Sequence, residues 1–220
     1  LQQPLEVGGG SRKSSWPLSA RRYQLAYITK DEARIAARAR LQKSYGSSAT
    51  QILREEVRAS ASAESFDVFL SHSSEDSEIV LGVREILVGL GLKVYIDWID
   101  DPQLDRGSVT AENADILRRR MRASKSLVYL TTKSSSTSRW MPWELGYFDG
   151  LKTGFIGVLP VVDAGGTFSG QEYLGLYPLV ERLALTGGGT KFCVVEKAGK
   201  GYRFLDDFAQ GQSSIRAFGS

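Results

Sequence analysis

The chain changes character at residue 66, where short apolar runs begin to alternate with segments of helical periodicity. The run 66–70 predicts a first strand. The apolar side chains that follow recur on one face of a helix, at Ile79, Val83, Ile86, Leu87 and Leu90. Further strands are predicted at 92–98, 126–131, 154–162 and 191–196. Strands that alternate with helices in this way form a parallel sheet covered on both faces.

The remaining helices of this region are predicted from caps and periodicity. They fall at 111–123, from Pro142 onward, at 171–185 and at 202–210. Pro142 suits the first turn of a helix, because the N–H that proline lacks would have no partner there.

Two capping signatures precede the sheet. Thr29 with Glu32, and Ser48 with Gln51, have the spacing of a capping box and predict a helical hairpin at about 30–60. We therefore divide the chain into four parts by composition and pattern. These are a flexible lead at 1–29, a helical extension at 30–62, an α/β domain at 65–210 and a tail at 211–220.

The order of the elements predicts the fold class. Strands alternating with helices over 65–210 suit an α/β flavodoxin-like fold, a five-stranded parallel sheet of order 2-1-3-4-5 with helices on both faces. Strands 1 and 3 are then neighbours, and a crevice opens at their carboxyl ends. The segments that follow these strands, 71–76 and 131–144, are the predicted binding site.

Composition narrows the choice of partners. The 28 basic and 25 acidic side chains leave a net charge of +3, too small to indicate a nucleic-acid partner. The dense basic run lies where a helix C-terminus favours cations, at Arg118, Arg119, Arg120, Arg122 and Lys125. No apolar run approaches the roughly 20 residues of a membrane-spanning helix, so we expect no membrane partner.

The single cysteine, Cys193, cannot form a disulfide within the chain, which fits a cytoplasmic protein. Because it lies in an apolar run, we interpret it as a core residue rather than a nucleophile. With one histidine and one cysteine, the usual zinc site cannot be assembled, and no metal is expected.

The segment after the first strand, Ser71-His72-Ser73, lacks a phosphate-cradling glycine loop. This disfavours a P-loop NTPase and a Rossmann dehydrogenase. The neighbours of His72 do not form a nucleophile elbow, so a Ser-His-Asp hydrolase is also disfavoured. Helix capping is an adequate explanation for both serines.

The candidate chemistry lies at Glu144 and Trp140. Glu144 falls in the first turn of the helix predicted from Pro142, where the helix dipole favours an ionised carboxylate. Trp140 lies four residues earlier, just ahead of that helix. An aromatic plane beside a carboxylate suits a flat ring attached to a sugar, and the carboxylate can stabilise an oxocarbenium-like centre. The pair fits N-glycosidic cleavage, while tryptophans that simply pack against the sheet would give the same pattern.

In their order along the chain, these motifs resemble TIR (Toll/interleukin-1 receptor) domains. Residues 66–72 resemble the family's first strand, 93–98 its second strand and 124–132 its third-strand segment. The loop 99–110 corresponds to the family's BB loop. Trp140 and Glu144 match the family's aromatic residue and catalytic glutamate at the same spacing.

The resemblance implies hydrolysis or cyclisation of NAD+, with NAD+ as the substrate and no separate cofactor. Glu144 is then the catalytic carboxylate that contacts the nicotinamide ribose, and Trp140 stacks on a ring. The other substrate-binding candidates are Ser71, His72, Ser73, Asp97 and Trp98.

The resemblance also implies assembly. Active TIR proteins commonly complete their site with a neighbouring subunit through the BB loop, so self-association is expected. Compact TIR proteins of bacterial anti-phage systems such as Thoeris make a signalling nucleotide for a separate effector, and NAD+ depletion is a second route to defence. Two alternatives stay open: a non-catalytic TIR interaction module acting by homotypic assembly, and a nucleoside-processing enzyme of flavodoxin-like fold.

Overall fold

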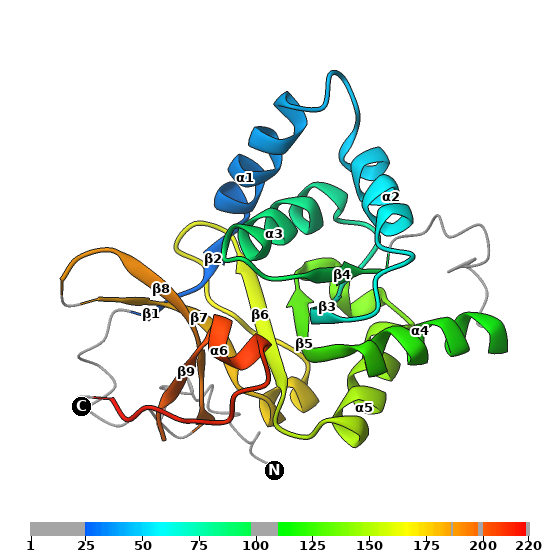
Figure 1. Cartoon of the computed structure of the whole chain (residues 1–220). Coiled ribbons are helices and arrows are strands. Elements are labelled where there is room, and N and C mark those ends of the chain that lie inside the picture. The colour runs from blue at the N-terminus through cyan, green and yellow to red at the C-terminus, as the bar shows by residue number, and fades with distance from the viewer. Residues whose placement is uncertain (1–24, 98–109, 186, 198–199, 219–220) are drawn as a thin grey trace, which may run out of the picture.

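The central sheet has the predicted α/β arrangement. The computed structural model describes residues 25–97, 110–185, 187–197 and 200–218. Parallel strands form its middle: β3 (Phe66–Ser71), β4 (Val94–Ile96), β5 (Ser124–Thr131) and β6 (Ile156–Val162). Their order in the sheet is β4-β3-β5-β6 (Figure 1), which confirms the predicted order 2-1-3-4.

The fifth place in the sheet is taken by β7 (Leu179–Ala184), which pairs in parallel with β6. We predicted a helix at 171–185. The structure has only the short 3-10 helix η3 (Glu172–Leu176) there, and the prediction is wrong for the rest of the segment. Leucine, glutamate, arginine and alanine in this segment favour a helix locally. However, β8 (Thr190–Val195) pairs with β7 along its whole length, and β6 pairs with it at Leu179, so tertiary pairing overrides the local preference.

An antiparallel extension completes this side of the sheet. The predicted fifth strand is β8, which lies one place further out and runs antiparallel to β7, followed by β9 (Tyr202–Phe204). The helix predicted at 202–210 forms as α6 (Leu205–Ala209), after β9.

Residues 25–29, which the sequence pattern assigns to a flexible lead, belong to the sheet. The short strand β1 (Leu25–Ala26) pairs with β7, and β2 (Ile28–Thr29) pairs with β6. A two-residue strand is too short to show a periodic pattern, so sequence alone could not reveal it.

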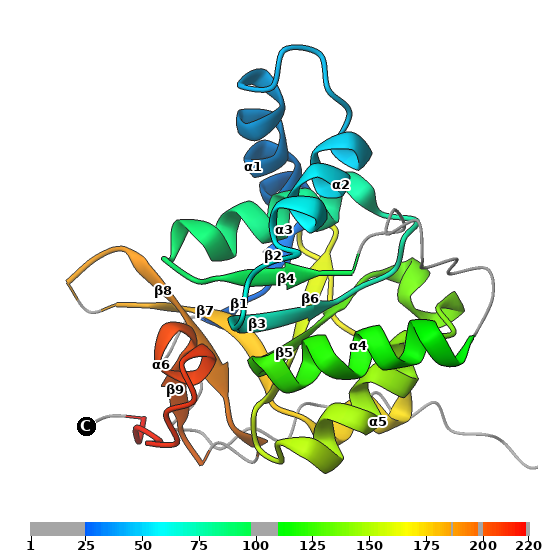
Figure 2. The same cartoon turned by 45° about the vertical axis from the view of Figure 1, so that its right-hand side comes forward.

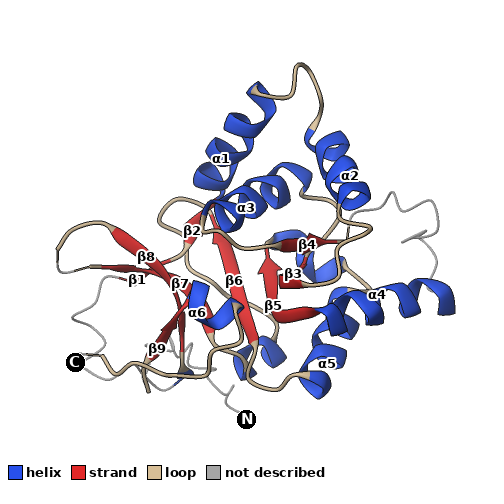
Figure 3. Cartoon of the chain, viewed as in Figure 1, coloured by secondary structure: helices blue, strands red, loops and turns tan. Residues whose placement is uncertain are grey.

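Helices cover both faces of the sheet, as Figures 2 and 3 show. The helix α3 (Ser77–Gly89) covers one face, and α4 (Ala111–Ala123) and α5 (Met141–Leu151) cover the other. Alternation along β3 sorts its side chains between these layers: Val68 and Leu70 join the core under α3, while Phe69 joins the core under α4 and α5. Ser71, two residues after Phe69, therefore lies on the α5 side.

The predicted helical hairpin is formed by α1 (Lys30–Gln42) and α2 (Ala49–Ala59), and both capping boxes are present. The hairpin packs on the outer side of α3 (Figure 2), where Ala33 and Ala37 of α1 are fully buried.

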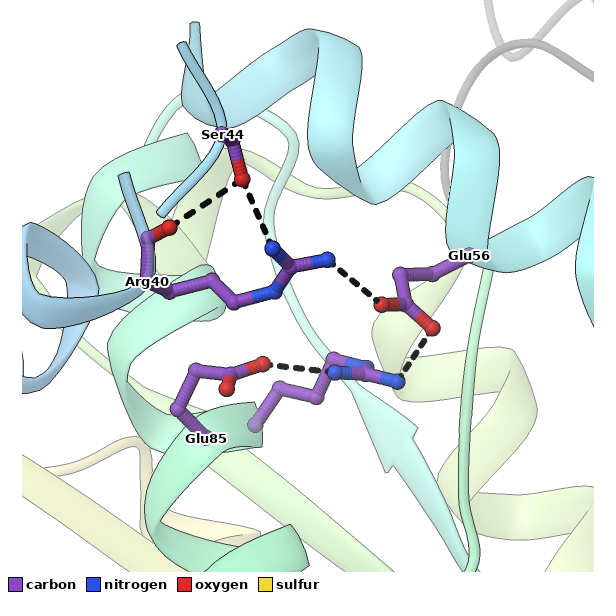
Figure 4. A network of polar contacts seen from close by, with 5 residues as sticks. Arg40, Ser44, Glu56 and Glu85 are labelled. Atoms are coloured by element: carbon purple, nitrogen blue, oxygen red, sulfur yellow. Dashed lines mark hydrogen bonds and ion pairs between the residues drawn. The ribbon is translucent and has the colours of Figure 1, made fainter. Parts of the chain in front are cut away.

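A network of ion pairs joins these three helices (Figure 4). Glu56 of α2 accepts hydrogen bonds from Arg40 of α1 at 3.4 Å and from Arg84 of α3 at 2.5 Å. Arg84 also donates to Glu85 at 2.6 Å, and Arg40 donates to the Ser44 hydroxyl at 2.7 Å. Because the Arg84 side chain is only 13% exposed, water screens its ion pairs less than at an open surface. The network holds the hairpin in one orientation on the α/β domain.

Candidate active site

A carboxylate and a hydroxyl meet at the carboxyl end of β3. Ser71 is the last residue of this strand, and its Oγ donates a hydrogen bond of 2.5 Å to Glu144 Oε2. Glu144 is completely buried, and Ser71 is 1% exposed. The two residues are 73 positions apart in sequence, and the packing of α5 on the sheet brings them together.

The position of Glu144 follows from the start of α5. The helix begins at Met141, one residue before the predicted start, with Pro142 in its first turn. The Glu144 N–H donates to the Trp140 carbonyl oxygen at 2.8 Å. The carboxylate therefore lies near the positive end of the helix dipole, which favours its ionised form.

Tyr129 adds a third polar group, which the sequence pattern does not indicate. It lies opposite Ser71 in the parallel pairing of β3 and β5 and is fully buried. Its hydroxyl lies 3.4 Å from that of Tyr173. Burial, then Tyr173 and the charge of Glu144, raise the pKa of Tyr129, so its phenol stays neutral. A tyrosine in a buried strand looks like a core residue in sequence, so only its position opposite Ser71 identifies it.

The structure places two further predicted residues at the same edge of the sheet. His72 is fully buried, with its Nδ1 2.8 Å from the Leu70 carbonyl oxygen. Asp97 is 2% exposed and directly follows β4, whose last residue pairs with Leu70. Trp98 lies outside the described residues.

Trp140 and Ser73 border a pocket of about 270 Å³ beside this cluster. The Trp140 side chain is 4% exposed and packs edge-on against Trp143, with ring centroids 5.5 Å apart. Trp140 is thus a packing residue and a pocket wall at once. A larger pocket of about 520 Å³ lies near Phe66 and Val94, where β3 and β4 begin, at the opposite end of the strands from Glu144.

Hydrogen bonds join the two loops that flank the 270 Å³ pocket. Asp76, in the loop after β3, accepts from Thr132 Oγ1 at 2.6 Å and from the Ser134 hydroxyl. Ser134 belongs to the 3-10 helix η2 (Lys133–Thr137), which leads from β5 toward α5. The sequence pattern indicates both loops but not the hydrogen bonds that join them. A loop rich in serine and threonine follows β5, and a loop with acidic residues follows the neighbouring strand β3. This pairing of hydroxyl and carboxylate side chains is the feature of the sequence that could have predicted the hydrogen bonds.

Within 25–97, 110–185, 187–197 and 200–218, no three His, Cys, Asp or Glu side chains are grouped so as to hold a metal ion. In the same ranges, no helix has both the length and the apolar character needed to cross a membrane.

The flavodoxin-like sheet, with a buried carboxylate close to where β3 and β5 end, has the arrangement expected of a TIR domain. No family model matches the chain. Over 148 residues it is 46% identical to the Bacillus cereus (strain MSX-D12) protein named "Probable 3' cyclic ADP-D-ribose synthase ThsB'", which covers 64% of this chain and 76% of that protein. Over 83 residues it is 34% identical to TIR2 of Cytobacillus dafuensis, which is named as a candidate cyclic ADP-D-ribose synthase. This match covers 37% of this chain and 22% of that protein. The chain belongs to the TIR-domain family, and within it to the proteins of Thoeris type.

Proposed function

We propose that this protein cleaves the bond between nicotinamide and ribose in NAD+ and closes the remaining ADP-ribose into a ring. The observation that carries the proposal is the buried Glu144 carboxylate, oriented by Ser71 at the carboxyl end of β3. The names of both relatives contain the words cyclic ADP-D-ribose synthase, which supports the same reaction.

The reaction breaks the C1′–N1 bond, and the bonding electron pair leaves with nicotinamide. The ribose becomes an oxocarbenium-like centre, which a nearby carboxylate stabilises electrostatically. A hydroxyl oxygen of the second ribose then bonds to C1′ and loses its proton, which gives cyclic ADP-ribose. Attack by water in its place gives linear ADP-ribose. The designation 3' in the name of the Bacillus cereus protein favours the ribose 3′-hydroxyl as the attacking group.

Each residue of the cluster has a role in this proposal. Glu144 accepts hydrogen bonds from the hydroxyls of the nicotinamide ribose and stabilises the positive centre. Ser71 fixes the orientation of the carboxylate through its 2.5 Å hydrogen bond. Trp140 presents an aromatic surface to a ring of the substrate, and the neutral phenol of Tyr129 keeps the wall of the site uncharged. His72, Ser73, Asp97 and Trp98 remain predicted substrate contacts.

The test is Glu144→Gln. Glutamine has the same size and can still accept the hydrogen bond from Ser71, so the fold should persist. Loss of the charge should lower NAD+ turnover by at least about 100-fold, as for other groups that stabilise charge in a transition state. Chromatography and mass spectrometry of the products would measure nicotinamide, cyclic ADP-ribose and ADP-ribose.

The matched control is Glu112→Gln, which makes the same change in the first turn of α4 at an exposed position. This variant should turn over NAD+ at the wild-type rate. Full NAD+ turnover by Glu144→Gln would rule out Glu144 as the catalytic carboxylate.

We also propose that the protein acts in anti-phage defence, by making a nucleotide signal that a separate effector reads, and that its active form is self-associated. The relationship to proteins of Thoeris type supports the defence role. The complete burial of Glu144 in one chain supports a site that is remodelled on assembly. The expected BB loop, 99–110, lies outside the described residues except for Thr110.

A further inference from the structure

The pocket beside Trp140 combines hydroxyl groups with a guanidinium. It is lined by Ser73, Ser74, Glu75, Thr137, Ser138, Arg139 and Trp140. The first three belong to the loop after β3, and the others form the approach to α5. The pocket is therefore built from the segment that follows Ser71 and the segment that precedes Glu144.

Arg139 is exposed, and it makes no hydrogen bond or ion pair with any residue of the described ranges. Other arginines of the protein are engaged: Arg118 with Asp115 at 2.7 Å, Arg182 with Glu32 at 2.6 Å and Arg203 with Glu196 at 2.7 Å. A guanidinium carries five N–H donors in a planar fork that matches phosphate oxygens. Toward the described residues, Arg139 thus keeps its full set of donors in the pocket.

Among the described residues that line the pocket, one side chain is acidic, that of Glu75. Glu75 Oε1 accepts a weak hydrogen bond of 3.4 Å from Thr137 Oγ1. The negative charge of Glu75 repels an anion and the positive charge of Arg139 attracts one. Binding of an anion in the pocket therefore depends on the Arg139 guanidinium. Removing Arg139 would leave the pocket lining with a net negative charge.

The covalent structure of NAD+ places an anion close to the pocket that Arg139 lines. The ribose that loses nicotinamide carries the diphosphate on its 5′ carbon, so a phosphate lies within a few bonds of any ribose that contacts Glu144. Trp140, on the pocket wall, adjoins Glu144 through the 2.8 Å backbone hydrogen bond of the first helical turn.

We infer that Arg139, with the hydroxyls of Ser73, Ser74 and Ser138, binds the diphosphate of NAD+. This inference rests on the proposed function and adds a substrate-binding residue to it. It also assigns the pocket to the diphosphate and leaves the nicotinamide ring to the buried cluster around Glu144.

The experiment compares Arg139→Ala and Arg139→Lys with Arg119→Ala. Arg119 is an exposed arginine of α4 outside the pocket, so its variant controls for the loss of one positive charge. Steady-state kinetics with NAD+ would give KM and kcat, and titration calorimetry with ADP-ribose would give Kd without any need for turnover.

For Arg139→Ala we expect KM for NAD+ and Kd for ADP-ribose to rise about 10- to 100-fold, the range for a lost charge-assisted hydrogen bond, with a smaller change in kcat. Lysine keeps the charge but not the fork, so Arg139→Lys should fall between alanine and wild type. Inhibition by free nicotinamide should be unchanged, because nicotinamide carries no phosphate.

Wild-type values of KM and Kd in Arg139→Ala, or an equal loss in Arg119→Ala, would overturn the inference. Failure of the proposed function has a different signature, because the wild-type protein would then leave NAD+ intact. The ADP-ribose titration decides the question even in that case. Weaker binding by Arg139→Ala than by wild type supports the inference, and equal binding or no binding by wild type overturns it.

Discussion

Glu181 is a carboxyl group buried inside a strand, which is an unusual place for an acid. It lies in β7, is 6% exposed, and stands opposite Cys193 of β8. Burial raises the pKa of Glu181 from its ordinary value of 4.5 to about 7. The same environment raises the pKa of Cys193 to about 12, first through burial and then through the charge of Glu181. The buried thiol is therefore a core group, as the apolar run around it predicts, and not a nucleophile.

The carboxyl of Glu181 makes stability depend on pH. Because its pKa is higher in the folded protein, the folded state holds more protons than the unfolded state between pH 4.5 and about 7. Stability conferred by the neutral form is thus complete below pH 4.5 and is lost as pH rises through 7. Glu181→Gln should raise the free energy of unfolding at pH 8 by roughly 1–3 kcal/mol and change it little at pH 4.5. Urea denaturation of both proteins at the two pH values would measure this, and an equal effect at both would contradict it.

At the scale of elements, the contact between α1 and α3 sets the place of the N-terminal hairpin. Gly82 of α3 faces the backbone of Ala33 so closely that a Cβ atom there would overlap the Ala33 carbonyl oxygen. Ala33 and Ala37 are fully buried at this crossing. Small residues on both helices allow the close approach. The ion pairs of Glu56, which belongs to α2, then hold the second helix of the hairpin in place.

Gly82→Ala should therefore push α1 away from α3. We expect a loss of about 1–3 kcal/mol in the free energy of unfolding, the usual cost of overpacking a core. Gly89→Ala, in the same helix, is the matched control, because no atom lies within 4 Å of a Cβ at that position. It should leave stability unchanged or raise it, since alanine favours a helix. Thermal denaturation of both variants would test this, and equal melting temperatures would show that the close contact does not matter.

At the scale of the whole molecule, the added elements surround the α/β domain without covering one common face. The hairpin α1–α2 packs beyond α3, while β8 and β9 extend the sheet on the side of β7 (Figure 1). Ser71 and Glu144 are both buried at the carboxyl end of β3. The proposed mechanism therefore requires this site to open before NAD+ contacts Glu144.

Self-association would favour such a rearrangement, because a second copy that binds the open form shifts the population toward it. We expect NAD+ turnover per molecule to rise steeply with protein concentration. Product analysis across a dilution series, with analytical ultracentrifugation at the same concentrations, would test this. Constant turnover per molecule from the monomer to the highest concentration would contradict it.

Local patterns were sufficient to predict much of this protein. Capping spacing identified both helices of the hairpin, and alternating apolar runs identified the strands from β3 to β6 and their order. Fold topology then directed attention to the loops after β3 and β5, where Ser71, Ser73, Trp140 and Glu144 come together. These features depend on contacts near in sequence or on rules of strand order, both of which a sequence displays.

The tertiary structure decided the rest. The segment 179–184 became a strand because β8 pairs along its whole length on one edge and β6 and β1 pair with parts of the other, against its local helix preference. Tyr129 lies at the site through its register opposite Ser71, and the role proposed for Arg139 rests on the pocket that it lines. The physical reason is the same in each case. Strand pairing, burial and shared pockets depend on residues far apart in the chain, and no local pattern records which of them will meet.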